Sequence, residues 1–90
     1  MSTLFEDSRD IGVVVSHFKR ETVDIEERPD AYLYKILAFG IDTDTMEEKV
    51  VYQSLENGHV WIRPREQFYS EVDKKKYPDI TQKFRFEALS

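Results

Sequence analysis

Five side chains of this sequence have the chemistry to bind a ligand or to exchange protons with one. They are His17, Lys19, Tyr52, Arg63 and Arg65. An arginine presents a planar fork of N–H donors that matches a carboxylate or a phosphate. Histidine changes its charge closer to neutral pH than other side chains do. We therefore expect these residues to form a binding surface for an anionic small molecule or peptide.

Structural roles compete with each of these interpretations. Arg63 is equally suited to an ion pair within its own chain, as many well-placed arginines are. Its possible partners are Glu47, Glu66 and Glu71. His17 could bond to a backbone carbonyl. Tyr52 could serve as an exposed stacking platform for nucleic-acid bases, although filling the core is the commoner use of such a ring.

The elements that must position these side chains are short strands. Segments rich in β-branched and aromatic residues, which favour strands, are found at 13–18, 32–39, 49–55, 59–62 and 82–89. Asn57-Gly58 predicts a tight turn, because both residues tolerate positive φ. Pro64 lacks an N–H and suits the start of a helical turn, predicted at 64–69. The pattern predicts a mostly β fold, a small five-stranded SH3-like roll or barrel with a short helical turn before the last strand.

Large aromatic rings must supply the core of so short a chain. The 90 residues include six Phe, five Tyr and one Trp, and a chain of this size buries only about 60–65% of its unfolded surface. We expect Trp61 and Phe68, on either side of the Arg63-Pro64 corner, to be buried, so that Trp61→Ala costs about 3–5 kcal/mol. Residues 1–11 are predicted to be a flexible N-terminal arm, and 12–90 a single domain.

Composition excludes several classes of site. With 13 basic and 18 acidic side chains the net charge is −5, which disfavours nucleic acid as a partner because that affinity rises with the number of phosphates neutralised. The sequence has no cysteine, so a disulfide framework and a thiolate zinc site are excluded. We expect a cytoplasmic protein, with no signal peptide and no membrane span.

Motifs for metals, cofactors and nucleophiles are missing from the sequence. Asp42-Thr43-Asp44 begins like a calcium loop, but Met46 stands where a third ligand is required. Neither a G-x-S-x-G motif nor a glycine-rich phosphate loop is present. We expect no metal and no cofactor.

Several blocks of the sequence, in their order and spacing, resemble the DUF1653 family of small, mostly bacterial domains of unknown function. The blocks are His17-Phe18-Lys19, Tyr34-Lys35-Ile36-Leu37, Val50-Val51-Tyr52-Gln53-Ser54-Leu55, Trp61-Ile62-Arg63-Pro64 with Phe68, and Lys83-Phe84-Arg85-Phe86. The resemblance covers roughly residues 13–88 and implies a compact SH3-like β-roll without implying an activity. The sequence departs from the family where residues 20–31 lengthen the segment after His17-Phe18-Lys19.

Three functional hypotheses remain open at this point. The first is a noncatalytic binding module that uses the five residues named above. The second is a small enzyme of undescribed type, with His17 as general base and Arg63 holding an anion. The third is a self-associating domain, in which an open strand edge such as Val13–Phe18 or the last strand pairs with another chain.

Overall fold

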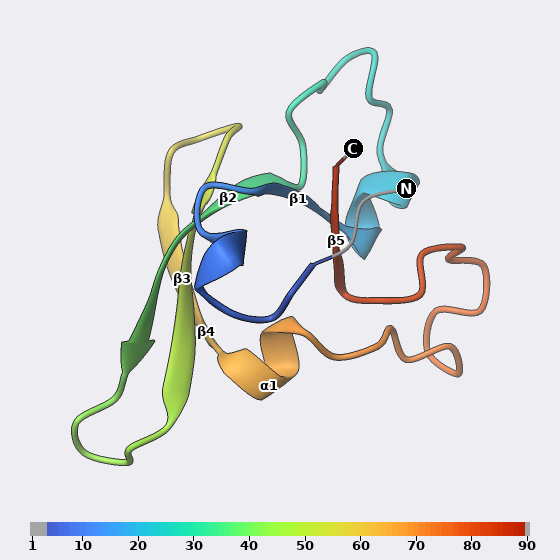
Figure 1. Cartoon of the computed structure of the whole chain (residues 1–90). Coiled ribbons are helices and arrows are strands. Elements are labelled where there is room, and N and C mark those ends of the chain that lie inside the picture. The colour runs from blue at the N-terminus through green and yellow to red at the C-terminus, as the bar shows by residue number, and fades with distance from the viewer. Residues whose placement is uncertain (1–3, 90) are drawn as a thin grey trace.

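One antiparallel sheet accounts for the fold in the computed structural model, which describes residues 4–89. Its strands are β1 (Val14–His17), β2 (Leu33–Ile41), β3 (Glu48–Ser54), β4 (Val60–Pro64) and β5 (Phe86–Ala88). The helical segments are η1 (Ser8–Asp10), η2 (Phe18–Thr22) and α1 (Arg65–Phe68). Figure 1 shows the sheet bent into an arch with α1 beneath it. The predicted five strands, mostly β class and helical turn before the last strand are confirmed.

The strand order β4-β3-β2-β1-β5 leaves two edges. Since β4 and β5 do not pair with each other, the sheet is open, and the word barrel describes it only loosely. Likeness to an SH3 domain stays a prediction. The prediction that Val13–Phe18 forms an open edge is wrong, because β1 pairs with β2 on one side and β5 on the other.

Local sequence explains how the sheet bends and turns. Gly58 has φ +78° and its N–H donates to the Ser54 carbonyl at 2.9 Å, which closes the predicted tight turn between β3 and β4. A bulge lies in β2 between Ile36 and Ala38. Bulges increase local twist and bend the strand, so this one helps to curl the sheet around its core.

Two stacked phenylalanine rings form the centre of the core. Phe68 is fully buried and Phe86 is 2% exposed, and their ring centroids lie 4.1 Å apart at an interplanar angle of 8°. The prediction that Phe68 is a core residue is confirmed. Around these rings pack Val15, Ile36, Val50 and Tyr52.

Trp61 does not belong to this core. Half of its surface, 50%, is exposed, and its ring contact is with His59, at 6.0 Å between centroids. The prediction that Trp61 is buried is wrong, and the large stability cost expected for Trp61→Ala falls with it. The physical reason is that β4 is an edge strand and that α1 places Phe68, not the indole, against Tyr52.

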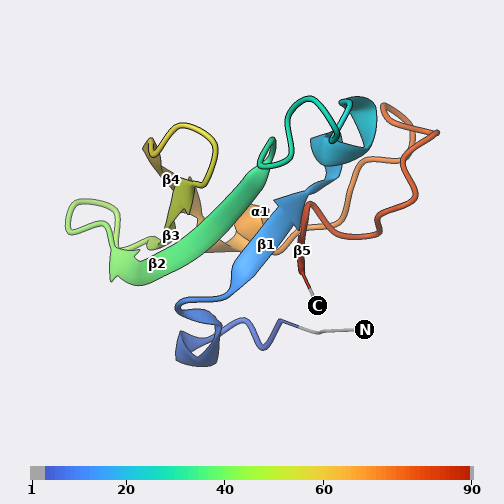
Figure 2. The same ribbon diagram turned by 90° about the horizontal axis from the view of Figure 1, so that it is seen from above.

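The segment before β1 is attached to Tyr69, the residue after α1, through a buried carboxylate. Asp10 accepts the backbone N–H groups of Phe5 and Glu6, both at 2.8 Å, and the Tyr69 O–H at 2.8 Å. Figure 2 shows the segment (blue) beside the beginning of β1. The boundary predicted between residues 11 and 12 stays a prediction. Within residues 4–89 no helix is long and apolar enough to cross a membrane.

Candidate functional site

The Phe86 ring is the centre around which three of the five predicted residues gather. The His17 ring lies 5.0 Å and the Tyr52 ring 5.4 Å from it, and Arg63 Cζ lies 5.8 Å from it. The Tyr34 ring lies 5.8 Å away. We define the arginine cluster as Arg63, Arg85, His17, Tyr34 and Tyr52.

Strand pairing explains why these side chains share one face of the sheet. Residues directly opposite each other in an antiparallel ladder project to the same side. Arg63 stands opposite the buried Val50, and His17 stands opposite Phe86. The concave, core-facing side of the sheet therefore carries the cluster at its margin.

Arg63 is held by neutral groups. Its Nε donates to the Tyr52 hydroxyl at 3.1 Å, and its Nη1 donates to Gln67 Oε1 at 3.3 Å. Among residues 4–89 it forms no ion pair, so the alternative of a pair with Glu47, Glu66 or Glu71 is not found there. No carboxylate of the described residues lies within ion-pair distance of its guanidinium group.

Arg85 is a second cation in the cluster, and the sequence did not single it out. Its Nε donates to Ser70 Oγ at 3.3 Å, and it too forms no ion pair with any described residue. Burial and the nearby Arg63 charge both lower the pKa of Arg85. Strict alternation over 82–89 predicts Arg85 on the outer face, but β5 begins only at Phe86. The signal in the sequence that could have identified Arg85 was its position directly before Phe86, a core residue.

His17 is buried and neutral. It is 7% exposed, and its Nδ1 accepts the Lys19 N–H at 3.1 Å, which caps η2. Burial, followed by the charges of Arg63, Arg85 and Lys19, lowers the pKa of His17 to about 3. With Nδ1 as acceptor, the ring proton sits on Nε2. Nε2 has no hydrogen-bond partner among the described residues. Every fully buried side-chain N or O atom of those residues does have a partner, so Nε2 is not fully buried and its N–H reaches solvent.

The cluster therefore offers donors. The free guanidinium N–H groups of Arg63 and Arg85 are donors, as is His17 Nε2–H. Tyr52 accepts from Arg63, so its own O–H remains available to donate. Lys19 is exposed at the margin of the cluster. Such a set matches an oxyanion, whose oxygens accept only.

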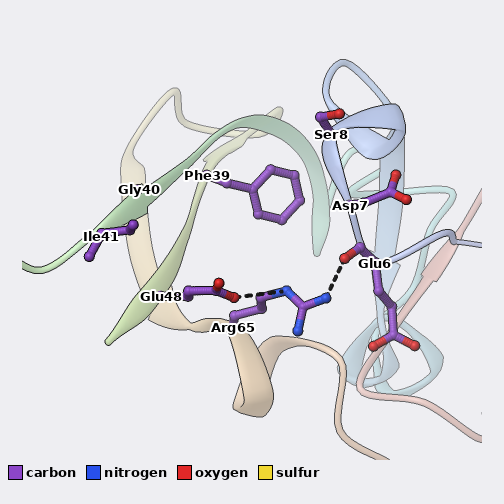
Figure 3. A pocket seen from close by; sticks show the side chains of 8 residues that line it. All are labelled: Glu6, Asp7, Ser8, Phe39, Gly40, Ile41, Glu48 and Arg65. Carbon is purple, nitrogen blue, oxygen red and sulfur yellow. Dashed lines mark hydrogen bonds and ion pairs between the residues drawn. The ribbon is translucent and has the colours of Figure 1, made fainter. Parts of the chain in front are cut away.

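Arg65 lies in a different environment. Its Nε is 3.3 Å from Glu48 Oε2, and its Nη2 donates to the Glu6 carbonyl. Figure 3 shows Arg65 between these two residues, at an open cleft of about 490 Å³. The lining residues are Glu6, Asp7, Ser8, Phe39, Gly40, Ile41, Glu48 and Arg65. With three carboxylates and one cation, this cleft is poorly suited to an anion.

Metal ligation finds no support in the geometry. Within residues 4–89 no three His, Cys, Asp or Glu side chains lie together as a group that could hold a metal ion.

Comparison with known proteins assigns a family but no activity. Neither the curated proteins nor the solved structures include a match to this chain. The model of a family described as protein of unknown function (DUF1653) matches residues 14–88, a range that contains the whole arginine cluster. The chain therefore belongs to the DUF1653 family.

Proposed function

We propose that this domain is a noncatalytic binding module that recognises an anionic small molecule or peptide through the arginine cluster. One observation carries the proposal: Arg63 Cζ lies 5.8 Å from the ring of Phe86, the residue directly after Arg85, and its charge lowers the pKa of Arg85, yet neither arginine has an ion pair among residues 4–89. Two like charges at one place destabilise each other. A bound anion offsets that repulsion, which is why perturbed charges gather at functional sites.

The protonation of His17 favours binding over catalysis. A general base works best when its pKa lies near the working pH, whereas the pKa of His17 is lowered to about 3. Its Nδ1 is already occupied by the Lys19 N–H. His17 therefore supports the proposal as a neutral N–H donor, and the hypothesis of an enzyme with His17 as base gains nothing from this environment.

Titration with inorganic phosphate tests the proposed function. We expect the arginine Nε–Hε NMR signals of Arg63 and Arg85 to shift, and Arg63→Gln or Arg85→Gln to weaken binding about 10-fold or more. A hydrogen bond to a charged group contributes about 1.5–3 kcal/mol. Arg65→Gln is the matched control. It removes the same charge only two residues after Arg63, but from an arginine that Glu48 already pairs.

Two results would contradict the binding module. One is an unchanged NMR spectrum with phosphate, acetate and citrate alike. The other is an Arg63→Gln variant that is unfolded in the absence of ligand, because that result would show that Arg63 has a structural role. Thermal unfolding of each variant separates loss of fold from loss of binding.

Self-association through β4 is a second candidate function. The outer edge of the sheet exposes three consecutive apolar side chains, Val60, Trp61 and Ile62. Exposed apolar edge strands are templates for pairing with another chain. Light scattering over a wide range of concentrations tests this hypothesis: a dimer that Ile62→Lys returns to monomer supports it, and a monomer throughout rejects it.

A further inference from the structure

Trp61 extends the arginine cluster along the edge of the sheet. It stands opposite Tyr52 in the ladder, so the indole and the Tyr52 ring project to the same face. Trp61 is two residues before Arg63, and alternate residues of a strand lie about 7 Å apart on one side. A half-exposed indole thus lies on the same face of β4 as Arg63, which has no ion-pair partner among the described residues.

The number and kind of donors indicate which anion fits. Two guanidinium groups carry two positive charges, and His17 Nε2–H and the Tyr52 O–H add neutral donors. A carboxylate offers one negative charge and two oxygens. A phosphate monoester offers nearly two negative charges and three strongly accepting oxygens, and arginine forks match its geometry.

We propose that the ligand is a phosphate monoester joined to a planar aromatic ring, the chemistry of a nucleoside 5′-monophosphate. The phosphate lies between Arg63 and Arg85, and the base stacks on Trp61. This inference rests on the proposed function, because it names the class of anion that the cluster takes. A free mononucleotide and the phosphorylated 5′ end of a nucleic acid share this chemistry.

Intrinsic fluorescence makes the inference testable, because Trp61 is the only tryptophan. The probes are adenosine 5′-monophosphate, ribose 5-phosphate, inorganic phosphate and adenosine, titrated into the full chain by fluorescence and calorimetry. We expect adenosine 5′-monophosphate to quench the indole and to bind about 5- to 150-fold more tightly than ribose 5-phosphate, the range that one base stacked on an aromatic side chain contributes. Adenosine, which lacks the phosphate, should bind far more weakly.

Trp61→Ala should remove the preference for adenosine 5′-monophosphate over ribose 5-phosphate. Because the indole is half-exposed, the variant is expected to stay folded, and circular dichroism on heating checks this. Ile62→Ala is the matched control: it removes a 65% exposed apolar side chain from the opposite face of the same strand, and both affinities should stay as in the wild type.

The outcomes separate this inference from the proposed function. Binding of phosphate that depends on Arg63 and Arg85, without any preference for the ring, overturns the inference and leaves the binding module intact. Binding of citrate but of no phosphate ester also overturns the inference and leaves the binding module intact. Failure of every anion overturns both. A 5′-phosphorylated oligonucleotide that binds more tightly than its 5′-hydroxyl form and than the mononucleotide assigns the ligand to nucleic acid; the reverse order assigns it to the free nucleotide.

Discussion

Arg63 and Arg65 stand on either side of Pro64, yet their surroundings are opposite in character. Arg63 still belongs to β4, so alternation places it toward Phe86 and among neutral groups. Pro64 ends the strand and α1 begins at Arg65. That change of direction turns Arg65 toward Glu48 and the Glu6 carbonyl. Two residues of one type, two positions apart, thus lie in different environments.

The comparison shows that the cleft lies beside a paired arginine, whereas Arg63 and Arg85, which have no described ion pair, lie elsewhere. The cleft beside Arg65 encloses about 490 Å³, but its cation is already paired. The arginine cluster has two cations that no described carboxylate neutralises. Recognition of an anion depends on charge and donors more than on volume, so the cluster is the better candidate.

Removing the shared core should break both regions at once. Phe86→Ala deletes the ring that stacks on Phe68 and underlies Arg63, and we expect a loss of about 3–5 kcal/mol in unfolding free energy. Urea denaturation measures this loss. Phe84→Ala is the control, since that ring is 39% exposed and should cost far less. Equal losses in the two variants would remove Phe86 from the core.

Asp10→Ala should damage the cleft and leave the arginine cluster intact. The substitution leaves the Tyr69 O–H and two backbone N–H groups without their acceptor, and hydrogen bonds to a charged group contribute about 1.5–3 kcal/mol. We expect a stability loss of that size, faster hydrogen exchange at Phe5 and Glu6, and unchanged phosphate affinity. Loss of phosphate binding in a folded variant would show that the two regions are coupled.

His17 should make the cluster side of the molecule sensitive to acid. Its pKa in the folded protein, about 3, lies below the ordinary value of 6.5, so between these values the unfolded chain binds more protons. The unfolding free energy contributed by His17 is complete above pH 6.5 and is lost as the pH falls toward 3.

His17→Asn should flatten this dependence while an amide oxygen still caps η2. Denaturation at a series of pH values from 7 to 4 measures the slope in both proteins. A slope that does not change in the variant would contradict the buried, neutral state of His17.

The smallest expected effects distinguish the arginines themselves. Arg65→Gln breaks a partly exposed ion pair, and such pairs contribute up to about 1 kcal/mol. Arg85→Gln removes a charge that Arg63 repels, so at low salt we expect no loss and a slightly higher melting temperature. Calorimetry at low and high salt measures both. A larger loss of stability for Arg85→Gln than for Arg65→Gln would contradict the expectation that Arg85, and not Arg65, is the arginine without a described ion-pair partner.

Much of the fold follows from short-range patterns. The five strand segments, the Asn57-Gly58 turn and the helical turn after Pro64 were all predictable, because alternation, positive φ and the missing proline N–H act within a few residues. Phe68 was predictable as core for the same reason. Trp61 was not, because its burial depends on whether another element covers the end of β4.

The candidate site divides in the same way. The sequence by itself determined which side chains could meet an anion, since the N–H donors of Arg63 and His17 and the hydroxyl of Tyr52 are properties of residue type. Only the tertiary structure decided that Arg85 lies near them, that Arg65 pairs with Glu48, and that His17 is buried with a lowered pKa. Each of these depends on which distant strands and loops approach, and burial and charge at a point in space come from residues that are far apart in the chain.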